Sequence, residues 1–395
     1  MSITVISIII ILVILSFIAY INFDYTSKYK KTEKDLYYEA LDLLIGGKLK
    51  EAYATLLSLI KNDTSNVKAY LKLGQVLREI GNPERALKIH RGLLIRKDLT
   101  TYENIELLRN IALDYKHLKK INDSIIQCLE ILKIEKRNEW ALLQLVDLYK
   151  SIDNWNSSQK YLERYQKITG NLDSRILGLY LIKQGQIEFD KKDFIKARSL
   201  FEEGLNMYDE LGISYKLTGD TYSEESEVEY QKSKEEDSDE SIEKAKDLLS
   251  KALLMWIKYA QHKPMHSSSV MHLIKDSLFA LDRYSELEHI LKDLVERDSN
   301  NISALITLAD YYSLQGENDK SISLLDSIKG KDKESVLARM VRLRLRFNIS
   351  SKVTDEMKDE FNDLMNEISK GRQSHSSILE DADFEWLNEN EHSEN

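Results

Sequence analysis

A single recurring distance limits what this chain can fold into. Three pairs of small or apolar residues are each separated by 34 residues. The pairs are Ala52 and Ala86, Ser124 and Ser158, and Leu287 and Ser321. A fixed period of this length is typical of stacked repeats, each of them a pair of antiparallel helices. The spacing therefore predicts a solenoid in which each repeat packs on its neighbours.

The composition indicates that the repeats are helical. Only 14 of the 395 residues are glycine and two are proline, whereas a β protein of this size needs many turn residues. Leu, Ile, Lys and Glu, which are abundant here, favour helices. Period and composition together predict an all-α fold, with tetratricopeptide repeats (TPRs) forming a right-handed superhelical solenoid. Such an array presents a binding surface and is seldom a catalyst.

Charge and cysteine content exclude several classes of function. The 66 acidic residues outnumber the 56 basic ones, giving a net charge of −10, whereas a nucleic-acid binder carries a basic stripe. The single cysteine, Cys128, allows neither an intrachain disulfide nor a zinc site with two or four cysteines. The sequence also lacks a glycine-rich phosphate loop, a nucleophile elbow and a zinc-protease motif. We therefore expect no cofactor, no nucleic-acid partner and no enzymatic activity.

The first residues predict a membrane anchor. Residues 3–23 contain no charged side chain, and 21 residues of helix span roughly 30 Å, about one hydrocarbon core. No basic residue precedes this run and no small-residue cleavage site follows it, so a retained anchor is favoured over a cleaved signal peptide. Lys28, Lys30, Lys31 and Lys34 follow closely, which places the body in the cytoplasm by the positive-inside rule. We expect a single-pass protein of the inner membrane, with an anchor over residues 1–23 and a linker over 24–35.

Six repeats are expected over residues 36–263. The second is the clearest, because Gly74 and Ala86 are small enough for its two helices to cross closely. Gly81 suits the end of its first helix, and Pro83 suits the first turn of its second. A charged insertion at about 225–240 adds about 14 residues to the sixth repeat, and such runs usually extend helices or loops into solvent. The residues expected to define the repeats are Ala40, Ala52, Gly74, Gly81, Pro83, Ala86, Ala112, Gly185 and Ala197.

The C-terminal part is expected to contain looser TPR-like repeats and capping helices over residues 264–371. Pro264 is the candidate for a bend between the two arrays. Residues 372–395 are rich in Ser, Glu and Asn, which predicts an acidic disordered tail. Phe384 and Trp386 within it form either a docking motif or two apolar residues placed by chance.

Five residues whose side chains could take part in chemistry have plain structural interpretations. His262 and His266 could share a helix face with His272 near, but Pro264 interrupts that helix, and a polar connection is favoured over a metal site. His90 occupies a position usually filled by a large core side chain, which favours a packed, hydrogen-bonded histidine over a proton-transfer group. Cys128 occupies the equivalent position in the next repeat, where a small buried hydrophobe fits.

The inner groove of a TPR array is lined by the first helix of each repeat. Helical register places a mixture of apolar, basic and polar side chains there, which resembles a peptide-binding channel. The expected groove residues are Tyr37, Leu41, Leu71, Gln75, Arg78, Arg109, Lys116, Leu143 and Asp147. Lys and Asn are missing from the positions of a chaperone-binding carboxylate clamp, so recognition of a chaperone C-terminus is disfavoured.

The second repeat resembles the lipopolysaccharide assembly protein B family. The shared pattern consists of Leu71, Leu73, Gly74, Arg78, Gly81, Arg85, Ala86, Ile89 and His90, followed by Leu99, Thr100, Asp114 and Tyr115. The resemblance covers roughly residues 35 to 170, and in topology residues 1 to 330. It implies one membrane helix and a cytoplasmic TPR body. It also implies an adaptor that brings the membrane protease FtsH to the deacetylase LpxC, thereby regulating lipid A synthesis, and that contacts the lipopolysaccharide transport machinery.

This chain departs from the family in one respect. The family ends in a rubredoxin-like module with two C-x-x-C pairs, and this sequence has no cysteine after Cys128. Either the acidic tail replaces the module, or the chain is a general TPR scaffold for another membrane or cell-envelope complex. If Arg78, Arg85 and His90 form a partner surface, an Arg78→Glu change should abolish partner binding and leave helicity intact.

Overall fold

The computed structural model describes residues 13–18, 32–299, 301–328, 336–349, 353–369 and 381–390. Most of the predicted anchor, residues 1–12 and 19–23, and most of the predicted linker lie outside these ranges. Among the described residues, no helix combines the length and apolar character needed to cross a bilayer. The anchor and its orientation stay predictions.

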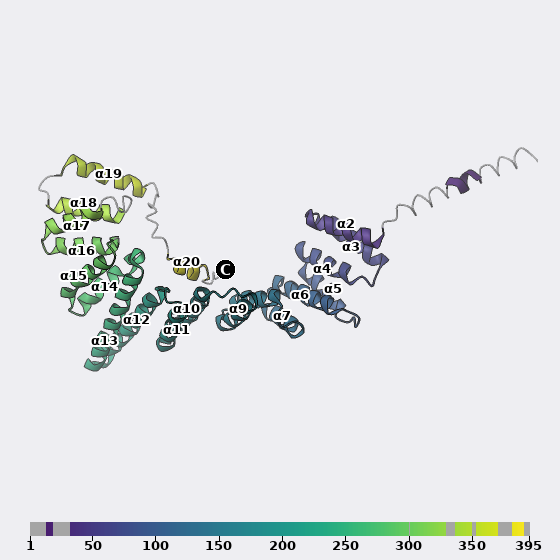
Figure 1. The fold of residues 1–395 in the computed structure, drawn as a ribbon, viewed down its shortest axis with the longest axis horizontal. Coiled ribbons are helices and arrows are strands. Elements are labelled where there is room, and N and C mark those ends of the chain that lie inside the picture. The colour runs from purple at the N-terminus through teal and green to yellow at the C-terminus, as the bar shows by residue number, and fades with distance from the viewer. Residues whose placement is uncertain are drawn as a thin grey trace, which may run out of the picture. The chain divides into compact units, whose positions relative to one another are not determined.

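The chain forms two compact units, Met1–Gly170 and Asn171–Asn395. In its described residues the first unit contains four helical hairpins, in which each helix packs on the next in sequence (Figure 1). Its helices are α2 (Glu33–Ile45), α3 (Leu49–Asn62), α4 (Val67–Glu79), α5 (Pro83–Leu93), α6 (Thr101–His117), α7 (Ile121–Ile134), α8 (Glu139–Lys150) and α9 (Trp155–Thr169). The even-numbered helices α2 to α8 are the first helices of their hairpins, here called A helices, and the odd-numbered ones are B helices.

The second unit continues the same pattern. Its first two hairpins pair α10 (Ser174–Asp190) with α11 (Phe194–Met207) and α12 (Ile213–Glu236) with α13 (Asp239–His262). They are followed by η1 (Pro264–His266), α14 (Ser268–Ala280), η2 (Tyr284–Glu286), α15 (Leu287–Arg297), α16 (Ile302–Leu314), α17 (Asn318–Ile328), α18 (Val336–Ile349), α19 (Asp355–Ser369) and α20 (Ala382–Glu389). No strand occurs in the described ranges, so this part of the chain is an all-helical, TPR-like solenoid. The handedness of the superhelix stays a prediction.

Small residues stand where the two helices of a hairpin cross. Ala52, Ala86 and Ala197 on the B helices are fully buried. In three other hairpins a serine takes this place and donates its hydroxyl to a carbonyl of the A helix 12 residues earlier. These bonds join Ser124 to Ala112, Ser158 to Val146 and Ser321 to Ala309, at 2.8, 2.8 and 2.6 Å. The buried hydroxyl is thus satisfied without widening the helix crossing.

Every turn inside the hairpins from α2/α3 to α16/α17 contains a residue with left-handed backbone. This residue lies two positions before the B helix, or before η2 in the α14 hairpin. Glycine fills the place in only three turns, at Gly47, Gly81 and Gly316, with φ of 71°, 92° and 81°. The other turns use Lys119, Asp153, Lys192, Asp237 and Asp282, with φ between 50° and 63°. Pro83 begins α5 as predicted, although Asn82 before it makes no side-chain cap bond.

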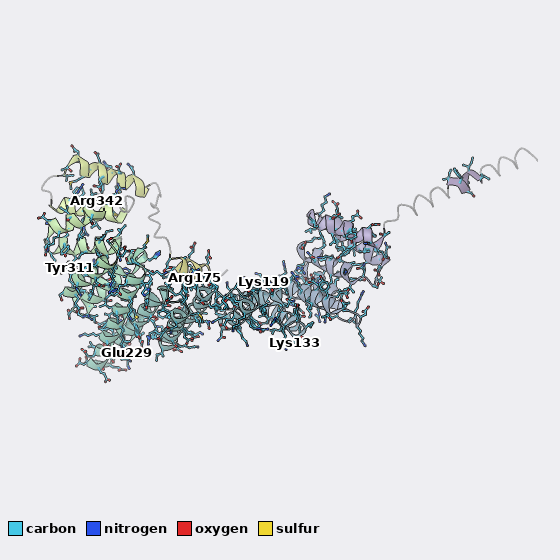
Figure 2. The ribbon with its side chains drawn as sticks, in the orientation of Figure 1. Lys119, Lys133, Arg175, Glu229, Tyr311 and Arg342 are labelled. Atoms are coloured by element: carbon cyan, nitrogen blue, oxygen red, sulfur yellow. The ribbon has the colours of Figure 1, made fainter. Side chains whose placement is uncertain are left out.

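The charged insertion lengthens a hairpin. Helices α12 and α13 have 24 residues each, whereas the other described helices have 17 or fewer. Ser226 donates to the carbonyl of Ala245 at 2.7 Å, and Lys244 pairs with Glu229 at 2.6 Å, so the added turns pack against each other. Figure 2 shows Glu229 on this hairpin. Of the two outcomes expected for a charged run, helix extension is the one observed.

Two expected boundaries differ from the structure. We placed a bend at Pro264, but one hydrophobic cluster runs from Trp256 through Ile274 to Leu308 across that point, so α13 and the helices after it share a core. The compact units divide at Gly170 instead. Residues 381–390, expected to be disordered, contain α20, whose Leu387 is fully buried in the second unit. The apolar side chains of α20 are buried against other helices of the second unit. Composition alone does not reveal that such a surface exists.

Candidate protein-binding groove

A buried charged cluster joins the second and third hairpins. Asp114 on α6 accepts hydrogen bonds from Arg78 on α4 at 2.6 Å and from Nδ1 of His90 on α5 at 2.5 Å. Nε2 of His90 faces the carbonyl of Leu71 at 3.2 Å. His90 and Asp114 are 0% exposed, and Arg78 is 7% exposed.

The cluster depends on a glycine. A Cβ atom on Gly74 would overlap the imidazole ring of His90, so only glycine lets α5 carry a histidine at this crossing. His90 is therefore packed and hydrogen-bonded, as predicted from its position in the repeat. A buried charge is tolerated when it is paired, and here one carboxylate pairs with two donors. This cluster holds two successive A helices in register and is closed to any partner.

Two expected groove residues are therefore inside the protein. Arg78 is buried against Asp114, and the side chain of Leu71 belongs to the hydrophobic cluster between α4, α5 and α6. Helical register correctly placed both on one side of α4, but that side packs against the next hairpin. Arg85 is exposed, and its guanidinium donates to the hydroxyl of Tyr53 at 3.3 Å. Because Arg78 and His90 are covered, the three residues do not form a common partner surface.

Further polar contacts link the A helices on their open side. The guanidinium of Arg109 on α6 lies over the ring of Trp140 on α8, 4.8 Å from its centroid. Lys116 on α6 donates to Gln144 on α8 at 3.4 Å. Both basic residues remain half-exposed. They bridge to the following hairpin and still present charge to solvent.

The remaining expected residues lie at or near this face. Leu143 is 39% exposed, and Asp147 is exposed one turn later on α8. Gln75 is half-buried and bonds to Lys72 and Glu79 along α4. Tyr37 and Leu41 are half-buried on α2, where burial, followed by the nearby Tyr102 hydroxyl, raises the pKa of Tyr37. The face around α6 and α8 thus combines an aromatic ring, two cations and an exposed leucine, and we define Arg109, Lys116, Trp140 and Leu143 as the A-helix face.

Sequence reasoning assigned no role in these sites to two of their members. Asp114 lies 36 residues after Arg78, close to one repeat length, and residues one repeat apart stand on neighbouring A helices. That spacing could have identified the pair. Trp140, which was not among the expected groove residues, is half-buried beneath Arg109 and contributes its ring to the A-helix face.

The two groups considered for other chemistry have structural roles. Burial raises the pKa of the Cys128 thiol to about 12, so the thiol stays protonated and packs as a small hydrophobe, as predicted. His262 packs on the ring of Tyr215 at 5.0 Å, while His272 is exposed on α14. Within the described ranges, no three His, Cys, Asp or Glu side chains come together as a metal site would require.

A second surface of interest lies in the second unit, where α20 packs on α10 (Figure 1). Arg175 of α10, labelled in Figure 2, pairs with Asp383 of α20 at 2.8 Å. The ring of Trp386 lies 5.7 Å from that of Tyr180. Phe384 and Trp386 thus pack against other helices of their own unit.

Comparisons with known proteins agree with the repeat architecture and leave the finer family assignment open. No family model matches the chain. Lipopolysaccharide assembly protein B of Escherichia coli K12 is 21% identical over 168 residues, which is 42% of this chain and 43% of that protein. This chain thus spans less than half the length of that relative.

Solved TPR structures also match. A tetratricopeptide repeat protein from Parabacteroides merdae is 12% identical, with a TM-score of 0.32, over 91% of this chain and 99% of that one. YrrB, described as a TPR protein with an unusual peptide-binding site, is 17% identical with a TM-score of 0.29, over 51% of this chain and 91% of that one. At these TM-scores the similarities carry no functional argument.

Proposed function

We propose that this protein is a non-enzymatic, membrane-anchored TPR adaptor that brings the protease FtsH to the deacetylase LpxC and so regulates lipid A synthesis. The supporting observation is the A-helix face, which offers half-exposed basic, aromatic and aliphatic side chains on two adjacent helices. Tryptophan and arginine dominate the energetics of many protein interfaces. The similarity to lipopolysaccharide assembly protein B over 168 residues supports the choice of partners.

The location follows from the same proposal. The uncharged run over residues 3–23 and the lysines after it would hold the solenoid at the cytoplasmic side of the inner membrane. The membrane protease and the deacetylase would then meet beside the bilayer. The A-helix face would contribute one of the two contacts.

A scaffold for another membrane or cell-envelope complex is the second candidate. The observation that favours it is that the similarity to lipopolysaccharide assembly protein B covers only 42% of this chain and 43% of that protein. The A-helix face would serve this function equally well. Partner identity is what separates the two candidates.

A pair of surface variants tests the adaptor function. Leu143→Asp places a charge on the A-helix face, and we expect it to weaken co-purification with FtsH and LpxC by about tenfold or more, the cost of losing a good apolar contact. Ile126→Asp is the matched control, since Ile126 is 51% exposed on the B helix α7. Equal co-purification by the two variants would contradict a role for the A-helix face.

A further inference from the structure

The surface beneath α20 is built from separate parts of the second unit. The A helix α10 contributes Arg175 and Tyr180, the A helix α12 contributes Lys216, and Lys263 follows α13. Three of these four residues are basic, although the chain as a whole is acidic. This positive group lies around the apolar cluster of Leu179, Ile182 and Phe201.

Helix α20 complements this surface in charge. Asp383 is 4% exposed and pairs with both Arg175, at 2.8 Å, and Lys263, at 3.3 Å. Asp381 is 5% exposed and lies 3.6 Å from the same lysine. Aspartates are almost never buried unless they are paired, so this burial marks a specific seat.

The apolar contacts of α20 follow a helical pattern. Leu387, one turn after Asp383, is fully buried in the apolar cluster. Trp386 packs near Tyr180, and the ammonium of Lys216 lies 5.4 Å from the ring of Phe384. Glu385 and Asn388 are exposed on the other side of the helix. The surface thus accepts an acidic amphipathic helix with aspartate, aromatic and leucine anchors in a fixed order.

The contact between α20 and this surface has the properties of a reversible interaction. Helix α20 has eight residues, and a helix this short is not stable alone in water. Among the described residues, the buried Oδ2 of Asp381 has no hydrogen-bond partner, which weakens the binding of this segment. A helix that satisfies this position would bind more tightly than the chain's own.

From these contacts we propose that this surface, the α20 site, is a peptide-binding site for an acidic amphipathic helix of a partner protein. Helix α20 occupies it until the partner's helix replaces it. The proposal deepens the adaptor function, on which it rests, by naming the surface and the chemistry of one partner segment. The partner segment would carry the order Asp-x-Asp-aromatic-x-aromatic-Leu found at residues 381–387.

The test uses the full chain and a fluorescent peptide with the sequence of residues 380–391. A double variant, Asp383→Lys with Leu387→Asp, removes two buried anchors and releases α20 without changing the surface beneath it. The matched control is Glu385→Lys with Asn388→Asp, which makes the same kinds of change on the exposed side of α20. Fluorescence anisotropy measures peptide binding, with a scrambled peptide of equal composition as a specificity control.

We expect the peptide to bind the released variant about tenfold or more tightly than the wild-type chain, because a tethered segment competes at a high effective concentration. The matched control should behave like wild type, and adding Arg175→Glu to the released variant should abolish binding. No binding to the released variant, or equal binding of the scrambled peptide, would overturn the proposal. A wild-type dimer that the released variant cannot form would place α20 on a second copy and would also overturn it.

This experiment contains neither FtsH nor LpxC. Loss of the adaptor function would appear in the Leu143→Asp co-purification, while loss of the α20 site would appear in peptide binding. The two failures are therefore distinguishable.

Discussion

At the scale of single residues, the buried cluster of Arg78, His90 and Asp114 is the most consequential feature of the first unit. One carboxylate satisfies two basic side chains from two other helices, and all three groups are shielded from water. Breaking a buried charge network costs far more than losing an exposed pair, because the remaining charges stay buried. The cluster therefore constrains which residues can be altered in any binding experiment.

Asp114→Ala should destabilise the first unit strongly. It leaves Arg78 and His90 buried without their acceptor, and we expect a loss of about 3–5 kcal/mol in the free energy of unfolding. Asp147→Ala removes an exposed aspartate from the next A helix and should change stability by about 0.5 kcal/mol or less. Urea unfolding followed by circular dichroism measures both. A small effect of Asp114→Ala on the free energy of unfolding would mean that the cluster does not hold α4 and α6 in register.

The same cluster changes the expectation for Arg78→Glu. We predicted from sequence that this change would leave helicity intact, but Glu at this position would be buried beside Asp114. Like charges at such a site disfavour the folded state. The substitution would therefore report on stability as well as on partner binding, and Leu143→Asp is the better probe.

Two glycine substitutions should have opposite effects. Gly74→Ala forces a Cβ into the ring of His90 and should destabilise by about 1–3 kcal/mol, the usual cost of overpacking. Gly92→Ala adds a methyl group in open space within α5 and should stabilise by about 0.5–1 kcal/mol, because alanine favours helix. Thermal unfolding of the full chain compares the two. A shift of the thermal unfolding midpoint in the same direction by both changes would contradict this explanation.

At the scale of elements, the turn inside each hairpin is the structural feature that the repeats share. Each turn from α2/α3 to α16/α17 needs one left-handed residue, and the sequence marks that need only where glycine supplies it. Gly81 was recognised for this reason, whereas the turns at Lys119, Asp153 and Lys192 carry no such signal. A left-handed backbone costs an ordinary residue roughly 1–2 kcal/mol.

Replacing Lys119 and Lys192 with glycine should therefore stabilise the chain. The free energy gained by relieving backbone strain exceeds the entropic cost of a more flexible unfolded chain. We therefore expect the free energy of unfolding to rise by about 0.5–1 kcal/mol at each position. The matched control is Lys120→Gly, next to Lys119, where φ is −90° and glycine brings only the entropic cost. Urea unfolding of the three variants provides the comparison. Stabilisation by Lys120→Gly, or destabilisation by the other two changes, would contradict this explanation of the turns.

Much of the element order could be read from the sequence, because repeat length, small crossing residues and helix caps are local signals. Ala40 and Ala52, or Gly185 and Ala197, lie at the crossings because nothing larger fits there. The groove was harder to predict. Helical register puts Arg78 and Arg109 on comparable sides of their helices, but only packing decides that Arg78 is buried and Arg109 is open.

At the scale of the whole molecule, the long-range contact of the tail was beyond sequence reasoning. Asp383 and Arg175 are 208 residues apart, and no period or motif connects them. The acidic composition around Asp383 predicts disorder, because the sequence does not reveal the basic surface that pairs with it. The division into units at Gly170 likewise follows from which helices share a core, and Pro264 proved to lie inside one.

We propose that this solenoid is an adaptor joining a membrane protease to its substrate. Crosslinking in membranes of the host cell, followed by detergent extraction, purification of the full-length chain and mass spectrometry, tests it most directly. We expect recovery of both FtsH and LpxC, with both reduced by Leu143→Asp and unchanged by Ile126→Asp. Recovery of a different membrane complex, with neither protein present, would contradict it and favour the general scaffold.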